Sequence, residues 1–250
     1  MRVTFPGVGE AFDETLPNTC VLLEAGEDSA LLDCGFTAAH AFWACAGAPL
    51  RLGAVWVSHF HGDHFLGLPL LLLRFWEQGR TAPLVLLGPR GVGELAVRAM
   101  DMAYPGFRAR MRFGLDVREM EEGRPVEAAG FRWTCAPGDH GAPCLAVRVQ
   151  ARGAAVFYSG DGKPTDATLA LARGADLVVH EAYALDAETP GHGTVAGAID
   201  FTRRARARRL WLVHVNREVR RERRRELEAL LRDAADVEAF LPEPGDALAL

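Results

Sequence analysis

Lysine is almost absent from this 250-residue chain: Lys163 is the only one, so arginine supplies nearly all of the positive charge. The net charge of −5 is that of an ordinary protein surface and does not indicate a nucleic-acid partner. One stretch differs, because residues 203–225 contain eleven arginines and two glutamates. Arginines near a helix end and Arg–Glu pairs are common on surfaces, and no aromatic residues interleave the second half of the stretch. We interpret it as a solvated face, with phosphate binding as the alternative.

The sequence also lacks a CxxC pair and a long apolar run, and we expect neither a leader segment nor a membrane span. The five cysteines are odd in number and contain no CxxC pair, which favours reduced, buried thiols in a reducing compartment. Pro6 and Gly7 interrupt the amino-terminal segment before an apolar signal region forms. The longest apolar run, residues 67–73, is too short to cross a bilayer. We therefore expect a soluble, cytoplasmic protein with no membrane attachment.

Short β-rich runs alternate with helical stretches along the whole chain, and no linker or low-complexity segment divides it. A tight turn at Arg152–Gly153 separates two of the runs. The pattern predicts one α/β domain over residues 1–250, with two packed sheets and helices outside them. We expect strands at 20–26, 29–35, 53–58, 83–88, 131–138, 144–150, 154–161, 176–181 and 209–215, helices at 67–79, 90–103, 165–175, 194–206 and 217–231, and a short β tail.

Most of the eight histidines lie at or just past the end of an expected strand, where α/β folds gather their ligands. The densest group is the loop VSHFHGDH, residues 57–64. His59 and His61 are two positions apart and face the same side of an extended segment, whereas Asp63 and His64 are adjacent and diverge. One ion cannot easily bind all four side chains, but two ions roughly 3.5–4 Å apart can. The loop therefore predicts a two-ion site.

Further donors must come from other strand ends. His140, Asp161 and His214 are the candidates, and the two oxygens of Asp161 suit it to a position between both ions. Two divalent ions lower the pKa of a water held between them, which yields a hydroxide nucleophile, and they polarise a phosphoryl or carbonyl group. His and Asp ligands accept zinc, manganese or iron, and zinc is our first expectation. His40, on a helix, is given no role, and His180 is expected either to support a metal ligand from behind or to pack at a strand end.

These motifs resemble the metallo-β-lactamase superfamily, whose signature is HxHxDH. The segments VSHFHGDHFLGLPLLL, LLGPRG, YSGD, VVHEAY, GHGT and LVHV are similar to the ribonuclease Z branch and its phosphodiesterase relatives. The resemblance implies a four-layer αββα sandwich, and it implies that Asp33 in LLDCG orients the ligand loop. It also assigns the ligands of two metal ions: His59, His61 and His140 for one, Asp63, His64 and His214 for the other, and Asp161 for both.

The resemblance further implies catalytic roles. His192 of GHGT is expected to give a proton to the leaving oxygen, Glu181 of HEAY to orient His192, and Asp63 to accept the proton of the nucleophile while binding metal. Lys163 in GDGKP matches a basic residue that precedes proline in ribonuclease Z. It either contacts a substrate anion near the metals or is exposed to water before a helix that starts at Pro164.

The substrate is expected to be smaller than the family suggests. Ribonuclease Z carries a protruding arm that grips tRNA, but only 21 positions separate His140 from Asp161, and two short strands fill them. We predict a dinuclear metal-dependent hydrolase that acts as a phosphodiesterase on a small or nucleotide-like substrate, with RNA as a further candidate and a homodimer implied by the resemblance. The alternatives are a lactonase or thioesterase, a non-catalytic metal-binding accessory protein, and tRNA 3′ processing, which the missing arm disfavours.

Overall fold

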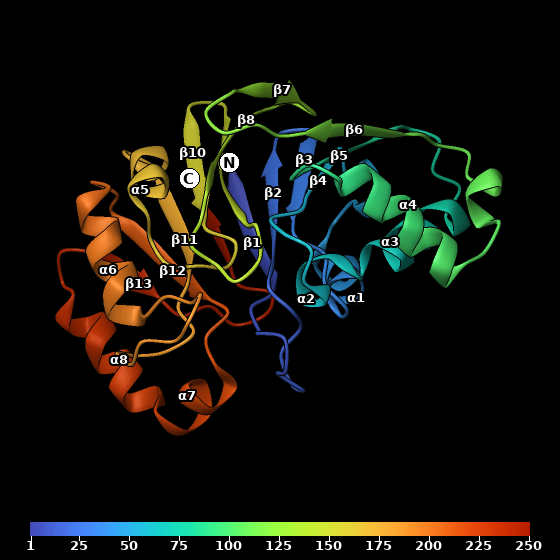
Figure 1. Ribbon diagram of the computed structural model, residues 1–250. Coiled ribbons are helices and arrows are strands. Elements are labelled where there is room, and N and C mark those ends of the chain that lie inside the picture. The colour runs from blue at the N-terminus through green and yellow to red at the C-terminus, as the bar shows by residue number, and fades with distance from the viewer.

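The computed structural model describes residues 1–250 and contains two seven-stranded sheets that pack face to face (Figure 1). The first sheet has the order β14-β1-β2-β3-β4-β5-β6, and the second has the order β13-β12-β11-β10-β9-β8-β7. The strands are β1 (Arg2–Gly7), β2 (Cys20–Ala25), β3 (Asp28–Leu32), β4 (Ala54–Trp56), β5 (Leu84–Gly88), β6 (Leu115–Glu119), β7 (Val126–Ala128), β8 (Phe131–Pro137), β9 (Leu145–Ala151), β10 (Ala154–Tyr158), β11 (Leu177–Glu181), β12 (Arg209–Val213), β13 (Glu238–Phe240) and β14 (Ala247–Ala249).

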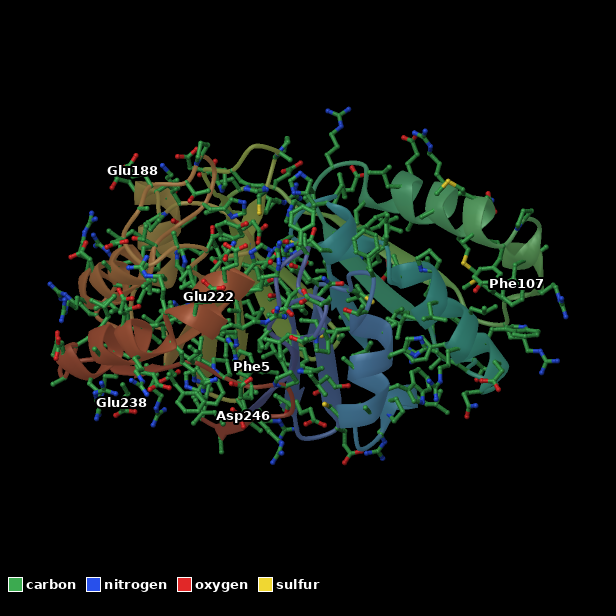
Figure 2. The ribbon with its side chains drawn as sticks, turned by 90° about the horizontal axis from the view of Figure 1, so that it is seen from below. Phe5, Phe107, Glu188, Glu222, Glu238 and Asp246 are labelled. Atoms are coloured by element: carbon green, nitrogen blue, oxygen red, sulfur yellow. The ribbon has the colours of Figure 1, made fainter.

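Helices cover the outer face of each sheet. Helices α1, α3 and α4 share a buried apolar cluster with the first sheet, and α5, α6 and α8 share another with the second sheet. In Figure 2, Phe107 lies at the end of the molecule opposite to Glu238. The expected αββα sandwich is confirmed. The helices are α1 (Ala38–Cys45), α2 (Gly62–Phe65), α3 (Leu68–Glu77), α4 (Val92–Ala103), α5 (Asp166–Ala172), α6 (Val195–Arg204), α7 (Arg217–Glu222) and α8 (Arg224–Asp233), with short 3-10 turns η1 (Pro49–Arg51) and η2 (Phe107–Arg110).

A third apolar cluster fills the space between the two sheets. Aromatic rings meet across it: Phe5 of the first sheet stacks on Trp211 of the second with ring centroids 4.7 Å apart, and Trp56 faces Trp133 at 6.3 Å. Burying such large side chains on both inner faces is what holds two sheets together. None of the helices is both long and apolar enough to cross a bilayer.

Three strands were not expected from the sequence. Strand β1 contains Pro6 and Gly7, which usually mark turns, and β6 and β7 are edge strands with little burial. The helix expected at 217–231 is wrong as one element, because it breaks at Arg223 into α7 and α8. No Gly or Pro marks that break: α7 forms ion pairs with the segment after β1, whereas α8 packs on α6 and β13. Contacts outside the segment therefore decide where it ends.

The connection between β9 and β10 is a tight hairpin. Arg152 and Gly153 both have positive φ angles, 51° and 81°, as a two-residue turn between antiparallel strands requires. Strand β10 then runs parallel to β11, and β11 runs parallel to β12, so their carboxyl ends lie at the same edge of the second sheet. The prediction that no protruding arm is inserted between His140 and Asp161 is confirmed.

Candidate metal centre

The candidate ligands lie at the carboxyl ends of strands from both sheets. In the first sheet, Asp33 follows β3 and the loop 57–64 follows β4, and these two strands are parallel. In the second sheet, His140, Asp161 and His214 follow β8, β10 and β12. Because the two sheets pack face to face, their strand ends meet at one rim of the sandwich. This placement brings the expected ligands together from segments more than 150 residues apart.

The ligand loop turns sharply at its centre because a one-turn helix begins there. His61, the residue before α2, has an extended backbone, whereas Asp63 and His64 project from the first turn of the helix. The turn is held against the end of β3: the Cys34 N–H donates to the His64 carbonyl at 2.8 Å. A Cβ on Gly35 would lie 1.8 Å from the Asp63 carbonyl oxygen, so only glycine permits this approach.

The first donor group combines three histidines and one carboxylate. His59 donates from Nδ1 to Ser58 Oγ at 3.0 Å, and His140 donates from Nδ1 to the Gly191 carbonyl at 2.7 Å. Both rings therefore present Nε2 to the site, where His140 Nε2 lies 3.2 Å from His61 Nδ1. Four ligand atoms of this group lie within 4.8 Å of one another, and they belong to His59, His61, His140 and Asp161.

The second donor group combines two carboxylates and two histidines. His64 Nε2 lies 3.2 Å from Asp161 Oδ1 and 3.3 Å from Asp63 Oδ2, and His214 Nε2 lies 3.2 Å from the same Asp63 oxygen. His59 Nε2, His64 Nε2 and Asp161 Oδ1 are buried without a hydrogen-bond partner. Buried donor atoms that face one another without partners fit metal ions well. The group, Asp63, His64, Asp161 and His214, shares Asp161 with the first.

Asp33 holds both the ligand loop and the second sheet. Its side chain is fully buried and accepts hydrogen bonds from the Ser58 N–H at 2.7 Å, the Ser58 hydroxyl at 2.7 Å and the Tyr158 hydroxyl at 2.6 Å. It also accepts from His64 Nδ1 at 2.7 Å, which leaves Nε2 of that ring free for a metal. The backbone of Asp33 is in the left-handed region, with φ of 60°, a strained conformation that is common at functional sites.

Replacing Asp33 with asparagine is expected to weaken metal binding by roughly 10–100-fold, because an amide cannot accept from all of these donors and orient the His64 ring. The dissociation constant for zinc, measured by competition with a chromogenic chelator, checks this. Asp116→Asn changes an exposed carboxylate on β6 and is the matched control. A zinc affinity of the Asp33 variant within twofold of the control would contradict the role given to Asp33.

The pKa shifts agree with neutral nitrogen ligands and charged carboxylates. Burial, together with the neighbouring His64, lowers the pKa of His59 to about 2, so this imidazole is neutral and can bind a cation. Burial opposes the charge on Asp63, but a hydrogen bond from His214 and the adjacent His64 ring outweigh it and hold the pKa of Asp63 below its ordinary value. His64 differs, because Asp161 outweighs burial and raises its pKa. A cation bound there displaces a proton.

His192 lies at the edge of the same pocket and is braced by Glu181. Its Nδ1 is 3.2 Å from Glu181 Oε1, its ring stacks on Tyr183 at 4.8 Å, and it is parallel to His214 at 5.7 Å. Glu181, His192 and His214 are also close enough to hold an ion. However, the Glu181 carboxylate already accepts from three backbone N–H groups, of Gly162, Tyr183 and Gly193. Glu181 is therefore placed where it can orient His192, and that role stays a prediction.

The structure also shows the surroundings of Lys163 and His180, for which the sequence left alternatives. The Lys163 ammonium lies 3.8 Å from the exposed Glu188 carboxylate and does not line the pocket around the metal-binding side chains, so its contact with a substrate anion stays a prediction. His180 is buried, donates to the Glu181 carbonyl at 2.7 Å and packs on Phe201. Of the two alternatives for His180, the structure favours the packed strand-end residue.

Several functional candidates were missed from the sequence. Ser58 and Tyr158 adjoin the motifs VSHFHGDH and YSGD, so their positions beside expected ligands could have indicated them. By contrast, no sequence motif indicates the residues that form the outer wall of the pocket around the candidate ligands. That pocket has a volume of about 510 Å³ and opens beside the two donor groups, and its outer wall consists of Glu10, Ala11, Phe12, Phe36, Tyr183 and Thr189.

Comparison with known proteins gives consistent matches. A protein-family model described as "Beta-lactamase superfamily domain" matches residues 28–215. The ribonuclease Z of Natronomonas pharaonis is 31% identical to this chain, over 98% of this chain and 96% of that protein. The ribonuclease Z of Methanothermobacter thermautotrophicus is 28% identical, over 88% of each protein.

Solved structures share the fold. The short form of human tRNase Z superimposes with a TM-score of 0.82 at 24% identity, over 100% of this chain and 99% of that one. A diphosphatase of the PhnP family superimposes with a TM-score of 0.76 at 17% identity, over 100% of this chain and 97% of that one. These likenesses extend along the full sandwich, including the strand ends that carry the two donor groups.

Proposed function

The chain belongs to the beta-lactamase superfamily and is a metal-dependent phosphodiesterase, and from this premise we propose that its substrate is a small phosphodiester rather than a tRNA precursor. The observation that carries the proposal is the pair of donor groups that share Asp161, with His192 at the edge of the same pocket. A single phosphodiester group fits between two cationic centres and one proton donor.

The donor groups support a site for two ions, for which we propose zinc. Two divalent ions supply Lewis acidity and an activated water near neutral pH. The protein residues fix the geometry for that chemistry. His59, His61 and His140 present neutral nitrogens from one side, and the Asp161 carboxylate faces both groups. We further propose that Asp63 accepts the proton released by the nucleophile, since its oxygen lies at the centre of the second group.

His192 is the proposed proton donor to the leaving oxygen. Its side chain lines the pocket and remains 19% exposed, so it can reach a bound substrate. Glu181 accepts a hydrogen bond from His192 Nδ1, so the Nε2 atom of the same ring is left to carry the transferred proton. Because backbone N–H groups fix Glu181, the imidazole is held in one orientation before the substrate binds.

The surface supports a small substrate. The β9–β10 hairpin has no arm, and the arginine stretch 203–225 is largely neutralised by carboxylates. Of its eleven arginines, only Arg206 and Arg225 have no salt bridge. Paired guanidinium groups have fewer free charges to offer to a nucleic-acid backbone. The core shared by both sheets supports a single domain over residues 1–250, and a homodimer stays a prediction.

A substrate panel on one zinc-loaded preparation, with metal content measured by elemental analysis, tests the proposal. We expect about two zinc ions per chain and turnover of bis-p-nitrophenyl phosphate and of cyclic nucleotides, with little cleavage of a tRNA precursor. The same preparation treated with a chelator is the control. Turnover of a lactone or thioester without turnover of any phosphodiester would reject the phosphodiesterase, and efficient tRNA 3′ cleavage would reject the small substrate.

A further inference from the structure

Two large aromatic side chains stand exposed at the mouth of the pocket. Phe12 is 71% exposed and Phe36 is 53% exposed, and both line the same pocket as the metal-binding side chains. Phe12 belongs to the segment between β1 and β2, and Phe36 precedes α1. Exposing aromatic surface to water is unfavourable unless something covers it. Their position beside a reactive centre indicates that the substrate covers them.

Phe36 is seated directly on the ligand loop. A Cβ on Gly62 would lie 2.1 Å from Phe36 Cζ, so the ring rests where a side chain at Gly62 would otherwise project. Gly62 lies between His61 of the first donor group and Asp63 of the second. A planar group that contacts Phe36 therefore lies beside Gly62, whose two chain neighbours each belong to one of the donor groups.

Phe12 is held by a braced segment rather than a free loop. Its backbone N–H donates to Glu10 Oε2 at 2.7 Å, and the fully buried Glu10 carboxylate accepts from Arg217 of α7 at 2.8 Å. The Arg217 guanidinium also lies 5.8 Å from the centre of the Phe12 ring. These contacts fix the ring at the pocket mouth, and in Figure 1 the segment extends below the strands on the side of α7 and α2.

A second arginine fixes the rest of this segment. Arg221 of α7 donates to Glu14 at 2.7 Å, to Thr15 at 2.9 Å and to Asp13 at 3.2 Å. Part of the arginine stretch thus has a structural task that its composition did not reveal. It ties the wall of the pocket to the helix that follows His214.

The charge of the pocket limits how many phosphates the substrate carries. The lining includes Glu10, Asp63 and Asp161 and contains no lysine or arginine. One phosphate is matched by the two ions of the proposed function, but no lysine or arginine lines the pocket to pair with a second, and the nearby Arg217 is already paired with Glu10. Like charges at short range are unfavourable, most of all where water is partly excluded. The pocket therefore suits one phosphate and an uncharged remainder.

We propose that Phe12 and Phe36 form an aromatic clamp for a nucleobase-like planar group, so that the substrate is a phosphodiester with one phosphate and one aromatic heterocycle. Stacking on aromatic side chains is tolerant of which base is bound, because every base has a π-face. This proposal rests on the proposed function, which places the scissile phosphate at the two donor groups. The clamp binds the part of the substrate that the metals do not contact.

The clamp is tested with two substrates that share one phosphate ring: adenosine 3′,5′-cyclic phosphate and the 3,5-cyclic phosphate of abasic ribose. The wild-type enzyme is expected to favour the nucleotide in kcat/KM, mainly through KM. Phe12→Ala and Phe36→Ala should each reduce that preference by roughly 5–100-fold, as expected for the loss of one stacking contact. Phe240→Ala removes a half-exposed ring on β13, far from the pocket, and is the matched control.

The bracing is tested in the same assay. Arg221→Ala should reduce the preference for the nucleotide, Arg221→Lys should restore part of it, and Arg225→Ala, at an exposed arginine without a salt bridge, should leave it unchanged. A purely stabilising role for Arg221 would lower the melting temperature and both activities together without changing their ratio. That pattern would overturn the bracing of Phe12.

Three results would overturn the clamp. Equal losses on both substrates in the phenylalanine variants would mean that the rings serve the fold. A change in oligomeric state by light scattering, with the preference intact, would mean that a second copy covers them. If the wild type hydrolyses neither substrate, the proposed function fails separately. In that case the binding of adenosine monophosphate and of ribose 5-phosphate to the wild-type protein is measured by calorimetry. Equal affinities for the two ligands would reject the clamp.

Discussion

Replacing Asp161 with asparagine is expected to remove most metal binding and to lower kcat by roughly three orders of magnitude or more, because metal ions supply several kcal/mol of transition-state stabilisation. Asp161 is the one side chain common to both donor groups, and its Oδ1 is buried without any other partner. An amide lacks the charge that two adjacent cations require. No neighbouring carboxylate can take its place, since Asp63 belongs to the second group alone.

Metal content by elemental analysis and kcat on bis-p-nitrophenyl phosphate check this prediction together. Asp200→Asn, at an exposed carboxylate on α6 that pairs with Arg204, is the matched control and should retain both metal and activity. Circular dichroism of the two variants separates loss of metal from loss of fold. An Asp161 variant that keeps two ions per chain and more than a tenth of the wild-type kcat would refute the shared-ligand role.

Replacing His192 with alanine is expected to reduce turnover by roughly 10²–10⁴-fold for substrates with an alkoxide leaving group, the range typical of general acid catalysis. For p-nitrophenyl esters the loss should be much smaller, because p-nitrophenolate leaves without a proton. This contrast follows from the position of His192, which lines the pocket and is oriented by Glu181 without being needed for either principal donor group.

The measurement is kcat/KM for a series of phosphodiesters that differ only in the pKa of the leaving group. The His192 variant should show a steeper dependence on that pKa than the wild type. His40→Ala, on the exposed face of α1, is the control and should match the wild type. A uniform loss across the whole series would instead indicate a role in binding or in metal retention.

The gathering of the candidate ligands at one place could be anticipated from the sequence for a physical reason, whereas their binding of metal stays a prediction. Motif spacing reports local backbone geometry, and the end of a strand reports which edge of a sheet a residue occupies. His59, His61, Asp63 and His64 follow one strand, and the structure places them with His140, Asp161 and His214 at one rim, as those two signals together imply.

The outer wall of the pocket could not be anticipated in this way. The contact between Glu10 and Arg217 joins residues 207 positions apart, on a loop and a helix whose relative position depends on the whole sandwich. The same limit explains the break at Arg223 and the unexpected strand β1, which both arise from tertiary contacts. The interpretation of the arginine stretch as a solvated face is partly corrected, because Arg220 is buried and Arg217 is half-buried.

The donor groups draw on both halves of the sandwich, since the loop 57–64 belongs to the first sheet and His140, Asp161 and His214 belong to the second. Ions bound there are therefore cross-links between the sheets as well as reagents. A ligand that binds only the folded state raises the free energy of unfolding by RT ln(1 + [L]/Kd). The melting temperature of this protein should consequently follow the free zinc concentration, so that metal supply sets how long the folded protein survives as well as how fast it works.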